Sequence, residues 1–141
     1  MGDITSHFSR SEFGLSEAKA ARHGCTGADY PAEWVEARLM PLARALERLR
    51  AELGGARITV VSGYRPLAYN RALGSLDTSQ HVQGRAADIQ VEGVAPAAVH
   101  AAALKLYERG ELEIGGLGIY DSFVHLDVRG GPLARWDERT K

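Results

Sequence analysis

The sequence predicts an α+β domain, in which helices pack on a small, mostly antiparallel sheet. Helical periodicity fills the first part of the chain, and short β-branched segments cluster in the second part. The last two of these segments are separated only by a tight turn. With 141 residues, of which 45% are hydrophobic, the chain is long enough for one domain with a real core. We therefore expect residues 1–141 to form a single domain.

The helical part should begin with a short helix over residues 17–23 and continue with a longer one that opens at Pro31. Apolar residues recur along the longer helix at steps of three and four, as on the buried face of an amphipathic helix. Pro41 lies inside this pattern and should kink or split the helix near Met40, because proline lacks the N–H that a helix needs. The apolar stripe consists of Trp34, Val35, Leu39, Leu42, Leu46, Leu49 and Leu53.

Strands are expected where β-branched or aliphatic residues gather between turn signals. Another helix, starting at Ala95 or Pro96 and ending at Arg109, separates the first two strands from the last two. A short helix or loop is expected around residues 67–73. The expected strands cover residues 57–61, 87–91, 114–119 and 123–128.

The two ends of the chain carry weaker patterns. We expect residues 1–14 to form an N-terminal arm and residues 130–141 to form an irregular C-terminal tail. The first residues contain no apolar stretch of the kind found in a signal peptide. The sequence therefore predicts synthesis in the cytoplasm without a leader.

Composition argues against several classes of function. The formal net charge is −1, from 17 basic and 18 acidic residues, so no basic excess indicates binding to nucleic acid or to a membrane surface. No apolar run approaches the roughly 20 residues of a membrane span. Cys25 is the only cysteine, which excludes a disulfide within the chain and a thiolate cluster for a structural metal.

The clearest candidate site consists of His81, Asp88 and His125. Two imidazoles and a carboxylate are a ligand set of catalytic zinc sites, which keep one position open for water. Six residues separate His81 from Asp88, and among them Gly84 and two alanines allow a tight turn. Taken singly, each histidine is more often a structural or surface residue than a ligand. We interpret His7, His23 and His100, which lack such surroundings, as ordinary residues.

Alternation along the last expected strand supports this interpretation. Phe123, His125 and Asp127 share one face of that strand, and the aliphatic residues between them share the other. The aliphatic face should contact the core, so the face with His125 and Asp127 should line a site. Asp88 at the start of another strand and His81 on the loop before it can complete the set.

In three segments the chain resembles the peptidase M15 family of zinc peptidases, the D-Ala-D-Ala carboxypeptidase and phage endolysin group. The first segment is Ser62-Gly63-Tyr64-Arg65-Pro66. The second is Ser79-x-His81-x-x-Gly84-x-Ala86-x-Asp88, and the third is Phe123-Val124-His125-x-Asp127. They occur in the order and at the separations typical of the family. The opening His7-Phe8-Ser9-x-Ser11-Glu12-Phe13 is also similar to small phage and bacterial members.

The resemblance implies a hedgehog/D-Ala-D-Ala peptidase-like fold and one Zn²⁺ per chain, bound by His81, Asp88 and His125. It implies that Arg65 holds the substrate or the developing oxyanion, a role that a guanidinium at a strand end suits. A surface arginine capping a turn is the other interpretation of Arg65. The resemblance further implies that Ser79 or Gln80 contacts the peptide substrate.

The chain departs from the family at the general base. Many members carry an acidic residue three positions before the last histidine, and others carry a histidine two positions before it. Here those positions hold Ser122 and Phe123, neither of which takes a proton from water at neutral pH. Asp121 is our preferred base, and Asp127 is the other candidate. Asp127 is equally suited to orient a histidine ligand through a hydrogen bond.

The predicted function is hydrolysis of peptide bonds in the stem peptides of bacterial peptidoglycan. The activity would be of the D-Ala-D-Ala carboxypeptidase type or the L-Ala–D-Glu endopeptidase type. We expect a monomer that acts on the cell wall after release, by phage lysis or as part of a virion. One alternative is a non-catalytic zinc-binding module that binds peptide or a protein partner. The second alternative is an α+β domain that binds no metal.

Overall fold

The structure is a computed structural model, and it describes residues 2–140. Helices pack against one five-stranded sheet, in which three neighbouring pairs are antiparallel and one is parallel. This arrangement confirms the predicted α+β class and the mostly antiparallel sheet. The strands lie in the order β1-β2-β4-β3-β5, with β1 at Ile58–Ser62, β2 at Ala86–Val91, β3 at Gly116–Ile119, β4 at Val124–Asp127 and β5 at Ala134–Asp137.

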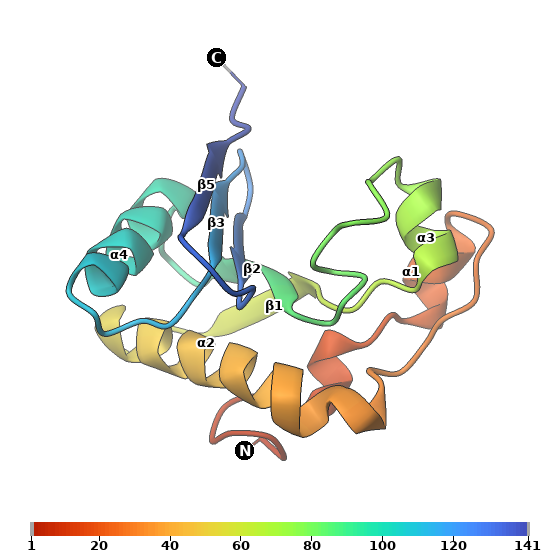
Figure 1. Ribbon diagram of the computed structural model, residues 1–141, viewed down its shortest axis with the longest axis horizontal. Coiled ribbons are helices and arrows are strands. Elements are labelled where there is room, and N and C mark those ends of the chain that lie inside the picture. Colours follow the sequence, from red (N-terminus) through yellow and green to blue (C-terminus); the bar gives the residue numbers. More distant parts are fainter. Residues whose placement is uncertain (1, 141) are drawn as a thin grey trace.

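Two long helices, α2 (Met40–Glu52) and α4 (Pro96–Glu108), enclose the main core with one face of this sheet. α4 lies beside the sheet and α2 runs below it (Figure 1). The core side chains alternate along the strands with those of the opposite face, as the predicted strand pattern requires. The core includes Leu42, Leu46 and Leu49 of α2, Val99 and Leu106 of α4, and Ile89, Leu117, Val124 and Leu126 of the sheet.

The helix expected from Pro31 is divided into three parts. A 3-10 helix covers Ala32–Trp34, a π-helix covers Val35–Leu39, and α2 follows from Met40. Pro41 lies in the first turn of α2, where its missing N–H costs no hydrogen bond. The predicted break near Met40 is therefore confirmed.

A smaller group of helices lies on the other side of the sheet from α4 (Figure 1). α1 (Glu17–Ala21) starts at Ser16, whose side chain accepts a hydrogen bond from the backbone N–H of Lys19. α3 (Leu67–Ala72) packs next to it, since Leu15, Ala20 and Tyr69 form a second apolar cluster. The expected N-terminal arm contains a 3-10 helix, Arg10–Phe13, and Phe13 is fully buried.

The prediction of an irregular tail over residues 130–141 is wrong at its centre. Ala134–Asp137 forms β5, which pairs in parallel with β3 at the edge of the sheet. The strand was missed because it is only four residues long and consists of Ala, Arg, Trp and Asp, of which only Trp favours strands. Within residues 2–140, no helix combines the length and the apolar character that crossing a membrane requires.

Candidate metal centre

Asp88 and His125 are brought together by strand register. They are directly opposite each other in the antiparallel pair β2·β4, so their side chains leave the same face of the sheet side by side. That face is opposite to the core, yet both residues are buried, at 4% and 6% exposure. Two adjacent strands therefore supply two of the three predicted ligands without help from any loop.

His81 reaches the same place from the turn that precedes β2. The backbone N–H of Arg65 donates to the His81 carbonyl at 3.1 Å, which ties the turn to the end of β1. Gly84 adopts φ +70°, and a Cβ there would lie 2.8 Å from the Trp34 ring. The Tyr30 hydroxyl donates to the Gly84 carbonyl at 2.6 Å, and burial raises the pKa of Tyr30 to about 12, so this donor stays neutral.

The three predicted ligands converge on one point. His81 Nε2 lies 3.2 Å from Asp88 Oδ1, and His125 Nδ1 lies 3.0 Å from the same oxygen. One ligand atom from each residue falls within 4.8 Å of the others. The rings of the two histidines meet edge to face with centroids 5.1 Å apart.

The outer hydrogen bonds of the two histidines decide which nitrogens face the centre. His81 Nδ1 lies 2.8 Å from the carbonyl oxygen of Gly63, which only accepts, so Nδ1 carries the proton. His125 Nε2 lies 2.8 Å from Asp127 Oδ2 and donates in the same way. In the neutral rings, His81 Nε2 and His125 Nδ1 therefore direct lone pairs towards a carboxylate oxygen. Such an arrangement suits a shared cation and fits zinc, whose usual ligands are imidazole nitrogen and carboxylate oxygen.

The charges around the centre affect the two histidines in opposite directions. Burial lowers the pKa of His81, which keeps its imidazole neutral. Burial opposes ionisation of Asp88, but the contacts with His125 and His81 outweigh it and hold its pKa well below the usual range. Burial also lowers the pKa of His125, but the carboxylates of Asp127 and Asp88 outweigh it and leave the pKa raised. A metal ion would take the place of that proton.

Asp127 anchors His125 from behind. It is fully buried, and its carboxylate accepts from Arg129 Nε at 2.9 Å and from Arg129 Nη2 at 2.7 Å. Burial opposes its ionisation, but the bonds from His125 and Arg129 outweigh it and hold the pKa of Asp127 at about 2. Gly116 makes room for this side chain, because a Cβ there would lie 2.1 Å from Asp127 Oδ2. The structure thus gives Asp127 the contacts of a residue that orients a ligand.

Arg65 lies next to the centre and is held by side chains on three sides. Its Nη2 is 3.3 Å from Asp88 Oδ2, its Nε donates to Ser62 Oγ at 3.1 Å, and its Nη1 donates to Asn70 Oδ1 at 3.3 Å. Asn70 is itself fully buried and donates to the carbonyl of Leu76 at 2.8 Å. Burial lowers the pKa of Arg65, although Asp88 acts against this. The guanidinium is therefore oriented beside the ligand set and is no surface cap.

A cavity of about 350 Å³ opens over the ligands. Ser79 and Gln80, the predicted substrate contacts, both line it, and Ser79 Oγ accepts from the backbone N–H of His81 at 3.2 Å. The other lining residues besides Arg65 and the three ligands are Ser75, Leu76, Thr78, Tyr120, Phe123, Arg129 and Trp136.

One wall of the cavity is aromatic, and the sequence analysis missed it. Trp136 of β5 lies opposite Gly118 of β3 in the register, and Gly118 lies opposite His125. Because Gly118 has no side chain, the Trp136 ring extends over it to within 4.9 Å of the His125 ring, between centroids. Trp136 Nε1 donates to the Tyr120 hydroxyl at 2.9 Å. The glycine on β3 was the available signal, since it marks a place where something approaches the backbone closely.

Asp121, the preferred base, does not line this cavity. Its carboxylate is exposed and accepts hydrogen bonds from the backbone N–H and the hydroxyl of Thr140. These bonds hold the pKa of Asp121 below its usual value. Among the described residues that line the cavity, Asp88 has the only carboxylate. A role for Asp121 as base stays a prediction, which requires this side chain to leave Thr140.

Strand pairing and one turn thus build a candidate mononuclear metal centre with an open side. A family model described as Peptidase M15 matches residues 6–127, which include all three ligands. The chain therefore belongs to the peptidase M15 family, as its motifs predict.

Two relatives are both named as peptidoglycan L,D-endopeptidases MepK. The Peptidoglycan L,D-endopeptidase MepK of Escherichia coli K12 is 33% identical over 116 residues, which are 77% of this chain and 59% of that protein. The Probable peptidoglycan L,D-endopeptidase MepK of Haemophilus influenzae is 32% identical over 91 residues, or 60% of this chain and 45% of that protein. The chain thus spans about half the length of these relatives.

Proposed function

We propose that this chain is a zinc-dependent peptidase that hydrolyses a peptide bond in the stem peptides of peptidoglycan, with the L,D-endopeptidase type favoured. The observation that carries the proposal is the convergence of His81 Nε2, His125 Nδ1 and Asp88 Oδ1 under an open cavity. Family membership and the names of the MepK relatives support the reaction class and the substrate.

The metal would be held by His81, Asp88 and His125. When bound in such a site, zinc lowers the pKa of a water molecule to about 7 and polarises a carbonyl group. The contribution of the chain is to orient both imidazoles, through the Gly63 carbonyl and Asp127, while burial keeps His81 neutral. The fourth side of the centre faces the cavity that the substrate would enter.

Arg65 is suited to stabilise negative charge on the carbonyl oxygen of the scissile bond. Its guanidinium is already oriented by Ser62 and Asn70, so little entropy is lost when a further N–H meets the oxygen. Ser79 and Gln80 offer polar groups on the same wall to the peptide backbone. We expect Arg65→Ala to reduce kcat by about 10²–10³-fold while the protein keeps its zinc.

The mechanism also needs a general base that accepts a proton from the attacking water. We keep Asp121 as the proposed base and Asp127 as the residue that orients His125. Paired variants test this: Asp121→Asn should abolish most turnover without loss of zinc, whereas Asp127→Asn should weaken zinc binding. Unchanged turnover in Asp121→Asn, with zinc-loaded Asp127→Asn inactive, would exchange the two roles.

A non-catalytic zinc-binding module is the second candidate. It is favoured by one observation, the lack of any carboxylate other than Asp88 among the described residues of the cavity wall. The deciding experiment incubates the zinc-loaded protein with purified peptidoglycan and identifies released fragments by mass spectrometry. New peptide termini that disappear on chelation support the peptidase and name the bond. A protein that carries one zinc and releases nothing supports the module.

The finer predictions from the sequence stay predictions. They are a D-Ala-D-Ala carboxypeptidase specificity, action on the wall after phage-type lysis or as part of a virion, and a monomeric state. The same fragment analysis separates the carboxypeptidase from the endopeptidase, since only the former releases a single terminal amino acid. Sedimentation of the zinc-loaded chain tests the monomer.

A further inference from the structure

A second cavity adjoins the metal centre on the side of α1 and α3. It measures about 290 Å³ and shares Arg65, Asp88 and Phe123 with the cavity over the ligands. The two cavities therefore adjoin at these three residues, and the second lies directly beside the ligands. We refer to the second cavity as the basic lobe, after the three residues Lys19, Arg22 and His23 that line its outer side.

The basic lobe has a clear excess of positive charge. Lys19, Arg22 and Arg65 line it, and Asp88, which belongs to the ligand set, is the only acidic residue among the described residues of its wall. Within residues 2–140, Lys19 and Arg22 have no ion-pair partner. Arg48 and Arg129, which line other cavities, are by contrast paired with Glu111 and Asp127. The charges of Lys19 and Arg22 are thus available to a ligand, whereas that of Arg65 faces Asp88.

The fold holds this charge in place although it comes from an early segment of the chain. The Lys19 ammonium donates to the carbonyl of Val61, at the end of β1. The His23 ring meets Tyr69 of α3 edge to face, with centroids 5.6 Å apart. The inner wall is apolar, formed by Val61, Tyr69, Leu73 and Phe123. The lobe therefore combines a cationic rim with an apolar wall.

We propose that the basic lobe is an anion subsite that binds a free carboxylate on the residue next to the scissile bond. This inference rests on the proposed peptidase function and adds to it which feature of the peptide is selected. A carboxylate gains charge-assisted hydrogen bonds from Arg22 and Lys19, and a small aliphatic side chain on the same residue contacts the apolar wall. A carboxamide at that place has no charge and replaces one acceptor oxygen with an N–H donor, so it is disfavoured.

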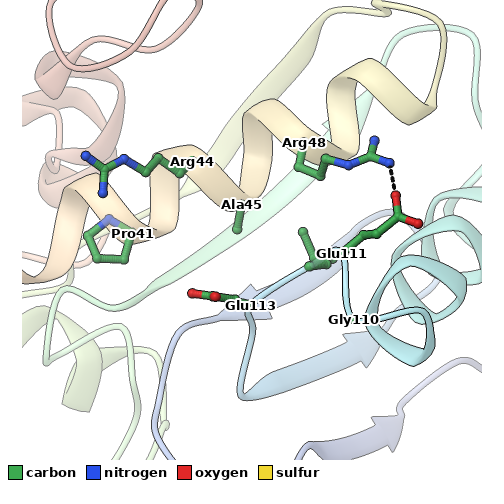
Figure 2. Close-up of a pocket in the computed structure, with 8 residues that line it drawn as sticks. Pro41, Arg44, Ala45, Arg48, Gly110, Glu111 and Glu113 are labelled. Atoms are coloured by element: carbon green, nitrogen blue, oxygen red, sulfur yellow. Dashed lines mark hydrogen bonds and ion pairs between the residues drawn. The ribbon is translucent and has the colours of Figure 1, made fainter.

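A groove elsewhere on the molecule provides the control. It lies between α2 and the connection from α4 to β3, on the helix side of the sheet, and has both signs of charge. Figure 2 shows Arg48 directed towards Glu111, with Arg44 and Glu113 facing the same groove. Arg44 is exposed, like Arg22, so Arg44→Gln makes the same change of charge away from the metal centre.

The experiment compares hydrolysis of two synthetic stem peptides that differ only in a free carboxylate or a carboxamide on the D-residue of the scissile bond. Wild type, Arg22→Gln, Lys19→Gln with Arg22→Gln, and Arg44→Gln are tested with zinc bound. Wild type should prefer the carboxylate peptide. The double variant should lose about 10–100-fold in kcat/KM for that peptide, mainly through KM, and little for the carboxamide. Arg22→Gln should show part of this loss, and Arg44→Gln none.

Equal preference for the two peptides in wild type, or an unchanged preference in both variants of the lobe, would overturn the inference and leave the peptidase function intact. Titration of the wild type and the double variant with the carboxylate and carboxamide forms of the D-residue product adds a measurement without turnover. If no peptide is cleaved, the proposed function fails, and the titration still decides the subsite. Binding that depends on the carboxylate and is lost in the double variant supports it, and equal binding refutes it.

Discussion

His81 and His125 contribute the same group to the centre but are positioned in different ways. His125 lies on β4 in the middle of the sheet, and its outer nitrogen meets the buried carboxylate of Asp127. His81 lies on a turn, and its outer nitrogen meets the backbone carbonyl of Gly63. The strand ligand depends on a charged network of side chains, and the turn ligand depends on backbone conformation. The difference indicates which substitutions should affect each half of the site.

The first test removes each ligand. Because the proposed site has only three protein ligands, His81→Ala and His125→Ala should each reduce zinc from about one per chain to almost none. His100→Ala, on α4, is the matched control and should keep its zinc. Metal analysis after gel filtration measures this. If either variant keeps about one zinc per chain, the substituted histidine is no ligand and the proposed three-ligand site is wrong.

The second test addresses the turn. In Gly84→Ala, the new Cβ meets both φ +70° and the Trp34 ring at 2.8 Å, so we expect a loss of about 2–4 kcal/mol in the free energy of unfolding. Gly93→Ala is the control, since Gly93 has φ +74° but nothing within 4 Å of the added Cβ, and should cost about 1–2 kcal/mol. Urea denaturation gives both values. Equal losses would mean that packing around Gly84 does not hold the His81 turn.

The third test addresses the strand. Asp127→Asn keeps the shape of the side chain but removes the charge that faces His125 and Arg129, and zinc affinity should fall about 10–100-fold. Asp77→Asn is the control, because Asp77 also pairs with an arginine, Arg71, but on the surface. Competition with a chromogenic chelator measures the affinities. An unchanged affinity in Asp127→Asn would show that the strand alone orients His125.

The ligand set could be predicted from the sequence, and much of the cavity wall and its surroundings could not. Alternation with period two places His125 and Asp127 on one face of a strand, and the aliphatic residues between them assign that face to the site. The direction of Asp121 depends on Thr140, which is 19 residues away, so the local pattern around the turn did not reveal it. The place of Trp136 depends on the parallel pairing of β5 with β3, which no local pattern near residue 136 indicates.

The contribution of the early helices was also beyond local patterns. Lys19 of α1, together with Arg22 and His23 directly after it, forms an ordinary charged segment when considered alone, and the sequence predicts no role for His23. They reach the depression around the centre because Leu15 and Ala20 pack with Tyr69 of α3. Such contacts between segments far apart in the sequence become visible only when the fold is assembled.

The smallest expected effect concerns one hydrogen bond of the turn that carries His81. Tyr30→Phe removes the donor to the Gly84 carbonyl and should cost about 0.5–1.5 kcal/mol of unfolding free energy, with zinc retained. Because folding raises the pKa of Tyr30 from 10.0 to about 12, its contribution is complete below pH 10 and declines as the pH rises towards 12. The difference in stability between wild type and Tyr30→Phe should therefore shrink across that interval. Denaturation series at pH 8 and pH 11 measure it, and a constant difference would mean that the hydroxyl of Tyr30 does not hold the turn.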